Sequence, residues 1–207
     1  MTMAQTADTQ PEGLPGDEFA DTRAACETHR GEHGAGCEVH PVSVEAGRLL
    51  RTLVRLSGGR RVLEIGSGGG YGSLWLSGGV ARSGWVESME SEPLHARLAR
   101  EQLAAHDVNR LVTVVEADFR ERAATVFGPY DFVLLQVAPR QYADLLPHLE
   151  RMLRLGGGLA LAHLDADWLA EDDRQAEREF LEAIGGSRHW DGLVVSEPHL
   201  GIWVRRE

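Results

Sequence analysis

The stretch Val62-Leu63-Glu64-Ile65-Gly66-Ser67-Gly68-Gly69-Gly70-Tyr71-Gly72 decides the fold class of this 207-residue chain. The apolar run Arg61–Ile65 predicts a buried strand, and a helical pattern over residues 71–80 follows the glycines. Glycine lets the backbone turn sharply and lets a ligand approach it closely. The dinucleotide spacing Gly-x-Gly-x-x-Gly fails, because Tyr71 stands where the third glycine is required. The stretch therefore predicts a ligand-binding strand–loop–helix unit of another kind.

Strand and helix patterns alternate through the rest of the chain. Expected helices cover residues 43–56, 71–80, 93–106, 141–155 and 172–184, and expected strands cover 61–65, 84–89, 111–116, 130–136, 157–162, 193–196 and 201–205. Such alternation predicts an α/β fold with a mostly parallel sheet and helices on both faces, and the terminal pair of strands predicts one antiparallel strand. We expect residues 1–20 to form a disordered tail, residues 21–40 to contain little helix, and residues 21–207 to form a single domain.

Three acidic residues follow successive predicted strands. The run from Glu64 to Gly70 has the pattern acid-x-Gly-x-Gly-x-Gly, which is typical of S-adenosylmethionine sites, where the acid and the loop amides engage the amino-acid end of the cofactor. Glu90 ends the second strand and is placed to accept hydrogen bonds from ribose hydroxyls. Asp118 follows the third strand, where it could accept from the adenine amino group. These positions together predict a Rossmann-like methyltransferase fold that binds S-adenosylmethionine.

Composition excludes several other classes of protein. The formal net charge of −11 argues against a nucleic-acid partner, because phosphate binding requires a basic face. The chain has no apolar run long enough for a membrane span and no apolar signal-peptide core, so we expect a cytoplasmic protein with no membrane partner. It also has no lysine, which excludes Schiff-base chemistry.

From about residue 40 onward, the chain resembles the small catechol and caffeoyl-CoA type O-methyltransferases. The resemblance rests on His40-Pro41-Val42, Arg61-Val62-Leu63-Glu64-Ile65-Gly66, Gly70-Tyr71, Met89-Glu90, Tyr130-Asp131-Phe132 and Gly157-Gly158-Leu159. It implies a seven-stranded sheet whose last strand is antiparallel, and a homodimer. It also implies that Glu64, Gly66, Tyr71, Glu90 and Asp118 line the cofactor. We expect four further residues to bind it, namely Ser67, Gly68, Gly70 and Gln136.

The resemblance does not extend to the positions where the family binds its metal ion and carries its catalytic lysine. Family members bind a divalent cation through an Asp after the fourth strand and an Asp-Asn pair after the fifth, where this chain has Gln136 and His163-Leu164. The position of the family's catalytic lysine is occupied by Pro139. Magnesium prefers carboxylate oxygens, so we expect chemistry that is independent of a metal.

Two histidines are candidates for the catalytic base. His40 aligns with a family residue that leans over the reactive methyl, and His163 stands at the former metal position. Histidine titrates near neutrality, so either could remove a proton from the acceptor, and the alignment favours His40. Trp168 and Trp190 are candidates for stacking on a flat acceptor, although packing is the simpler role for each, and we expect Trp75 and Trp203 in the core.

The pairs Cys26-x-x-His29 and Cys37-x-x-His40 have ligand types that suit zinc. However, the gap between the pairs is short compared with zinc modules. The alternative is an active-site lid in which His40 faces the methyl and the cysteines are buried or reactive.

The sequence thus predicts a methyltransferase, most simply an O-methyltransferase, acting on a small hydroxylated or amine-bearing molecule of specialised metabolism. Two alternatives stay open. In one, the bound sulfonium serves as a fixed charge for a cyclisation, elimination or rearrangement. In the other, the chain is a non-catalytic, cofactor-binding partner of another subunit.

Overall fold

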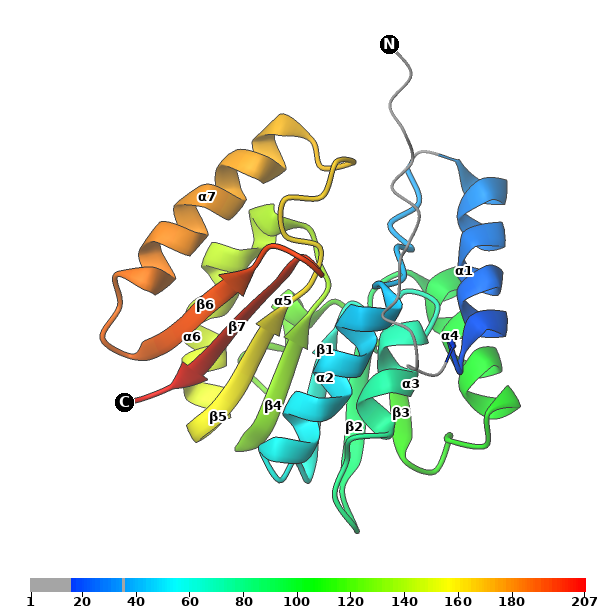
Figure 1. Ribbon diagram of the computed structural model, residues 1–207, viewed down its shortest axis with the longest axis horizontal. Coiled ribbons are helices and arrows are strands. Elements are labelled where there is room, and N and C mark those ends of the chain that lie inside the picture. The colour runs from blue at the N-terminus through cyan, green and yellow to red at the C-terminus, as the bar shows by residue number, and fades with distance from the viewer. Residues whose placement is uncertain (1–15, 35) are drawn as a thin grey trace.

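The computed structural model describes residues 16–34 and 36–207, which form a single sheet flanked by helices on both faces (Figure 1). Its helices are α1 Ala20–His33, α2 Val44–Leu56, α3 Tyr71–Ser77, α4 Pro93–Ala105, α5 Phe119–Arg122, the 3₁₀ helix η1 Pro139–Gln141, α6 Tyr142–Met152 and α7 Glu171–Gly185. Its strands are β1 Arg61–Ile65, β2 Trp85–Glu90, β3 Val112–Glu116, β4 Tyr130–Leu135, β5 Leu153–Leu161, β6 Trp190–Val195 and β7 Leu200–Arg205.

The seven strands lie in the order β3-β2-β1-β4-β5-β7-β6. Neighbours from β3 to β5 pair in parallel, whereas β7 pairs antiparallel with both β5 and β6. This confirms the predicted mostly parallel sheet with an antiparallel last strand. The chain runs from β1 to β2 and β3 on one side and then returns to β4 on the other side of β1. Such a switch point opens a crevice at the carboxyl ends of the strands.

Alternate residues of the strands face two separate hydrophobic cores. Val62 and Val86 point toward the core that α2, α3 and α4 cover, and Leu63 and Met89 point toward the core of α5, α6 and α7. All four side chains are buried. Because both faces of the sheet are covered, apolar residues occupy both sets of alternating positions in these strands.

The N-terminal segment differs from the prediction. Residues 1–15 of the expected tail lie outside the described residues, but residues 16–20 are packed against the domain. The Tyr71 hydroxyl donates to Asp17 at 3.0 Å, and the Phe19 ring meets Trp75 edge-on with centroids 5.0 Å apart. The expectation of little helix over residues 21–40 is wrong, because α1 occupies most of that segment. Its buried residues Thr22 and Cys26 dock it on the domain.

A second difference lies after β4. The helix predicted over residues 141–155 ends at Met152, and β5 begins at once with Leu153. Leu153 pairs with Tyr130 and is buried, so sheet pairing overrides the helical pattern there. Among the described residues, no helix combines the length and apolar content that crossing a membrane requires.

Candidate active site

The glycine loop after β1 holds three residues in the left-handed region, with φ of 89° at Gly66, 50° at Gly68 and 86° at Gly70. A Cβ at Gly66 would lie 2.3 Å from the Gln136 carbonyl oxygen, and one at Gly70 would lie 3.1 Å from the Ala99 Cα. Both glycines are therefore required by packing within the domain. A Cβ at Gly68 would meet nothing closer than Val39 at 3.9 Å, so this position faces open space.

Two adjoining cavities lie at the carboxyl ends of the strands, with about 710 and 860 Å³ of empty space. Of the nine predicted cofactor residues, Gly66, Gly68 and Gln136 line both cavities. The first cavity also contains Ser67 and Tyr71, and the second also contains Glu90 and Asp118. Seven of the nine predicted cofactor residues therefore line these two cavities, which share part of their walls at the strand ends.

Glu64 and Gly70 line neither cavity. Glu64 is fully buried behind the loop, where its carboxylate accepts hydrogen bonds from Ser73 and Ser88. Burial raises the pKa of Glu64 to about 7. The structure thus makes Glu64 an anchor for the loop rather than a residue that lines the cofactor cavity. Gly70 has a comparable structural role as the N-cap of α3.

The acid at the end of β2 is tied to the glycine loop. The Gly68 amide donates to one oxygen of Glu90 at 2.7 Å, and the Glu92 amide donates to the other at 3.0 Å. Glu90 is almost entirely buried, and this burial raises its pKa. Asp118 is more exposed, accepts from the Arg120 amide and pairs with its guanidinium at 2.6 Å. Hydrogen bonding to Arg120 lowers the pKa of Asp118, so it stays a carboxylate.

Two buried polar atoms beside the glycine loop have no hydrogen-bond partner among the described residues. Gln136 donates its amide to the Gly66 carbonyl at 3.2 Å and to Glu64 at 3.4 Å, while its Oε1 is buried without a hydrogen-bond partner. The Ser67 hydroxyl is likewise buried and unpartnered. Buried polar groups are normally satisfied, so these two atoms fit a site that receives a polar ligand.

The first cavity ends in a cluster of rings. His40 stacks on Trp168 with centroids 3.8 Å apart and planes inclined by 6°, and the His163 ring lies 6.3 Å from His40. The backbone of His163 has a φ of 63°, in the left-handed region. Non-glycine residues held there cost about 1–3 kcal/mol and gather at active sites. The structure brings the two predicted catalytic histidines together at the cavity wall.

Hydrogen bonds distinguish the two histidines. The Arg30 guanidinium lies 2.9 Å from His40 Nδ1, and because arginine can only donate, Nδ1 must accept. The neutral His40 ring then carries its hydrogen on Nε2 and has no free nitrogen to take a second proton. The His40 backbone favours the protonated form of the His163 ring, whereas the Arg30 charge disfavours protonation of His40. The geometry therefore contradicts the preference for His40 as base.

The expected titration near neutrality is also wrong for both rings. Burial lowers the pKa of His40 to about 4, with help from the Arg30 charge. Burial likewise lowers the pKa of His163 to about 4, and His40 adds to the shift. Both imidazoles are consequently neutral at physiological pH.

The cysteine and histidine residues of the predicted zinc set are not brought together. The Cys26 sulfur packs against Gly69, where a Cβ would lie 2.2 Å away, and burial raises the pKa of its thiol to about 12. His40 belongs to the ring cluster at Trp168. Only His29 and Cys37 approach each other, and they do so beside His95 of α4.

The tryptophans separate into two groups. Trp168 is half exposed and lines the first cavity. Trp190 is buried in the core, donates to Glu150 at 3.1 Å and lies outside both cavities, so it is not an acceptor residue. Trp75 and Trp203 are buried, as predicted.

Sequence reasoning missed several polar residues of the crevice. Arg140 lines the first cavity. One nitrogen of its guanidinium donates to both carboxylate oxygens of Asp173 of α7, at 2.8 and 3.1 Å. Arg30 was missed because α1 itself was missed. The spacing of Phe19, Thr22 and Cys26, three to four residues apart, is the signal that could have found that helix.

Comparisons with known proteins identify the family of the chain. The family model described as protein-L-isoaspartate(D-aspartate) O-methyltransferase matches residues 40–161. The catechol O-methyltransferase of Mycobacterium tuberculosis is 31% identical over 175 residues, which cover 75% of this chain and 79% of that protein.

Solved structures share the fold. The O-methyltransferase from Bacillus cereus, in complex with S-adenosylhomocysteine, superposes with a TM-score of 0.75 at 23% identity over 94% of each chain. The O-methyltransferase TomG from Streptomyces achromogenes, in complex with S-adenosylmethionine, superposes with a TM-score of 0.76 at 23% identity. The match covers 95% of this chain and 93% of that one. The chain belongs to the S-adenosylmethionine-dependent O-methyltransferases, class I enzymes of the catechol and caffeoyl-CoA type.

Proposed function

We propose that this enzyme methylates a hydroxyl group of a small molecule without a divalent cation at the acceptor, and that it is an enzyme of specialised metabolism. The observation that carries the proposal is a single cavity with the glycine loop on one wall and His40, His163 and Trp168 on another. TomG, which is described as involved in tomaymycin synthesis, supports the class of metabolism by analogy of fold. With methyl transfer as the family's activity, neither alternative, the fixed-charge reaction or the partner subunit, is needed to explain the site.

For the cofactor, we assign the second cavity to the nucleoside and the first to the amino-acid end. Glu90 would accept from the ribose hydroxyls, and Asp118 from the adenine amino group. The unpartnered atoms of Ser67 and Gln136 would bind the polar amino-acid end, which Gly66, Gly68 and Tyr71 also line. Bound there, S-adenosylmethionine supplies a methyl group that is electrophilic because it is attached to a sulfonium.

At the acceptor end, His163 would take the proton of the acceptor hydroxyl on a ring nitrogen, so that the oxygen can attack the methyl carbon. His40 would present its Nε2 hydrogen to the acceptor as a hydrogen-bond donor and would be held by Arg30 and Trp168. Methyl transfer also requires the oxygen to lie in line with the carbon–sulfur bond, which is a matter of positioning.

The acceptor class can be tested with three groups of compounds: hydroxylated aromatics, primary amines and an isoaspartyl peptide. We expect S-adenosylhomocysteine and an acceptor heavier by one methylene unit only with hydroxylated small molecules. Methylation of the isoaspartyl peptide alone would overturn the proposal, because it would identify a protein carboxylate as the acceptor.

Ribose recognition leads to a prediction about Glu90. Replacing Glu90 with alanine should weaken S-adenosylhomocysteine binding by about 1.5–3 kcal/mol, the usual scale for hydrogen bonds to a charged group. Glu87 is a matched control on the same strand, since its carboxylate accepts from Tyr130 at 2.8 Å and lies outside both cavities. Calorimetry should show a loss for Glu90→Ala only. Equal losses in the two variants would mean that Glu90 does not bind the ribose.

The absence of a carboxylate set at Gln136 and His163 leads to a prediction about metal. Adding magnesium to dialysed enzyme should leave the initial rate unchanged, because an amide and an imidazole are poor ligands for this ion. Added ion is a cleaner probe than a chelator, which would also remove a softer metal bound elsewhere. A rate that rises severalfold with magnesium and saturates would contradict metal independence.

We further propose that the enzyme is a cytoplasmic homodimer. The edge strand β6 exposes Leu193 and Val194, an apolar surface that a second copy could cover. Light scattering should give twice the mass of the chain, and Leu193→Glu should lower it toward the monomer. A wild-type protein that is monomeric at micromolar concentration would refute the dimer.

A further inference from the structure

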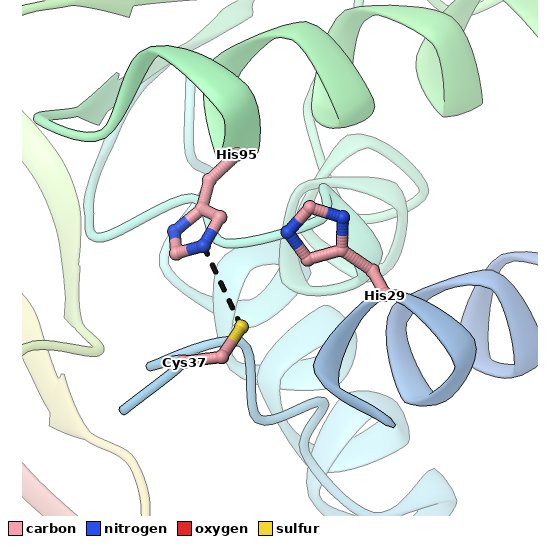
Figure 2. A group of neighbouring side chains, drawn as sticks. All are labelled: His29, Cys37 and His95. Carbon is pink, nitrogen blue, oxygen red and sulfur yellow. Dashed lines mark hydrogen bonds between the residues drawn. The ribbon is translucent and has the colours of Figure 1, made fainter. Parts of the chain in front are cut away.

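Three side chains from separate elements converge beside the second cavity: His29 from α1, Cys37 from the segment before α2, and His95 from the first turn of α4 (Figure 2). Their ligand atoms all lie within 4.8 Å of one another. The Cys37 sulfur and the His95 Nε2 are 3.6 Å apart. The proposed methyl transfer gives no role to His29 or Cys37, and His95 only lines the wall of the second cavity.

The spacing suits a tetrahedral zinc ion. Zinc lies about 2.3 Å from sulfur and about 2.0–2.1 Å from imidazole nitrogen, so a tetrahedral ion separates its ligand atoms by roughly 3.3–3.6 Å. The Cys37–His95 distance already equals that separation. His29 needs a shift of roughly 1.5 Å at most to complete the set.

His29 provides an independent observation. Its Nε2 is buried and has no hydrogen-bond partner within residues 16–34 and 36–207. In Figure 2, one ring nitrogen of His29 points toward His95 and Cys37. A buried imidazole nitrogen without a partner is costly, and a metal ion would satisfy it.

We propose that His29, Cys37 and His95 bind one zinc ion. One sulfur and two imidazoles form a soft ligand set that favours zinc over magnesium or calcium. On binding, the Cys37 sulfur bonds to zinc as a thiolate and its proton is released to solvent. The fourth position is taken by water, as in other zinc sites with three protein ligands.

The surroundings of His95 support the assignment. Its Nδ1 faces Glu90 Oε1 at 3.9 Å, so a carboxylate lies on the side of the ring away from the sulfur. Carboxylates in this place orient histidine ligands of zinc. Because His95 also lines the second cavity, the ion would fasten α1 and the following segment to the wall of the cofactor crevice.

Metal analysis of full-length enzyme, purified without chelator and then dialysed, tests the proposal. We expect about one zinc per chain, and none in Cys37→Ser or His95→Ala. Cys26→Ser and His40→Ala are the matched controls and should retain the ion. They separate this ligand set from the set suggested by the sequence, which contains Cys26 and His40 and lacks His95.

Titration of the metal-free wild-type chain with cobalt gives a second readout that needs no variant to fold. Cobalt bound by a thiolate should show a sulfur-to-metal charge-transfer band that zinc abolishes. If the wild-type chain neither contains zinc nor gives this band, the cluster is only a thiol–imidazole contact and the proposal fails. It fails equally if His95→Ala keeps full zinc content.

Discussion

Replacing Gly68 with valine should abolish cofactor binding. Gly68 lines both cavities, and a Cβ there points into open space, so the valine side chain would occupy the volume that the cofactor needs. Its amide also donates to Glu90, and a changed φ would break that link. S-adenosylhomocysteine raises the melting temperature of a protein that binds it by mass action, and this shift should vanish in the variant.

Gly58 is a matched control for this substitution. It has a φ of 67°, a Cβ there would meet nothing within 4 Å, and it lies in neither cavity. A β-branched residue at such a φ costs about 1–3 kcal/mol in either place. Gly58→Val should therefore lose similar stability and keep its cofactor-induced shift. Normal calorimetric binding by Gly68→Val would show that the cofactor lies elsewhere.

Removing the ring of His163 should slow methyl transfer by about 10²–10⁴-fold, the usual contribution of a general base. Cofactor affinity should change little, because His163 lies at the acceptor end of the crevice. His40→Ala should cost less, since His40 Nδ1 is engaged by Arg30 and its other nitrogen carries the hydrogen. Rapid-quench measurement of the first turnover separates these rates from product release.

The pH profile should reflect the depressed pKa of His163. A base must be unprotonated to act, and with a pKa of about 4 the ring is neutral throughout the physiological range. The acidic limb of the rate should accordingly appear as the pH falls toward about 4, not near the ordinary histidine value of 6.5. The limb should disappear in His163→Ala, and added imidazole should restore part of the rate.

Two results would reverse this assignment. A larger loss of methyl-transfer rate in His40→Ala than in His163→Ala would mean that the Arg30–His40 hydrogen bond is broken in the working enzyme. If the methyl-transfer rate falls by less than about 10-fold in both variants, the protein supplies no base and positioning alone drives the transfer.

The cofactor half of this enzyme was predictable from sequence because its determinants are local. Gly66 and Gly68 lie in a short loop, Glu90 is the last residue of β2, and Asp118 lies two residues after β3. Carboxyl ends of parallel strands meet at one edge of a sheet, so positions at strand ends predict proximity without any knowledge of packing.

Glu64 shows where such reasoning stops. Its position in the motif predicted a cofactor contact, yet the structure places it behind the loop, bonded to Ser73 and Ser88. Strand residues alternate between faces, and whether a polar residue faces ligand or core depends on what the neighbouring strand presents. Ser88 belongs to β2 and pairs with Glu64 in register, a relation that sequence spacing does not contain.

The sequence by itself determined the fold class, the glycine loop and the strand-end acids, because each depends on residues a few positions apart. Only the tertiary structure decided how the histidines are used. Arg30 reaches His40 through a helix that docks by burying Thr22 and Cys26. His95 meets Cys37 from a position 58 residues further along the chain. Contacts of this kind arise when whole elements pack to bury apolar surface, so they depend on the shape of the complete domain.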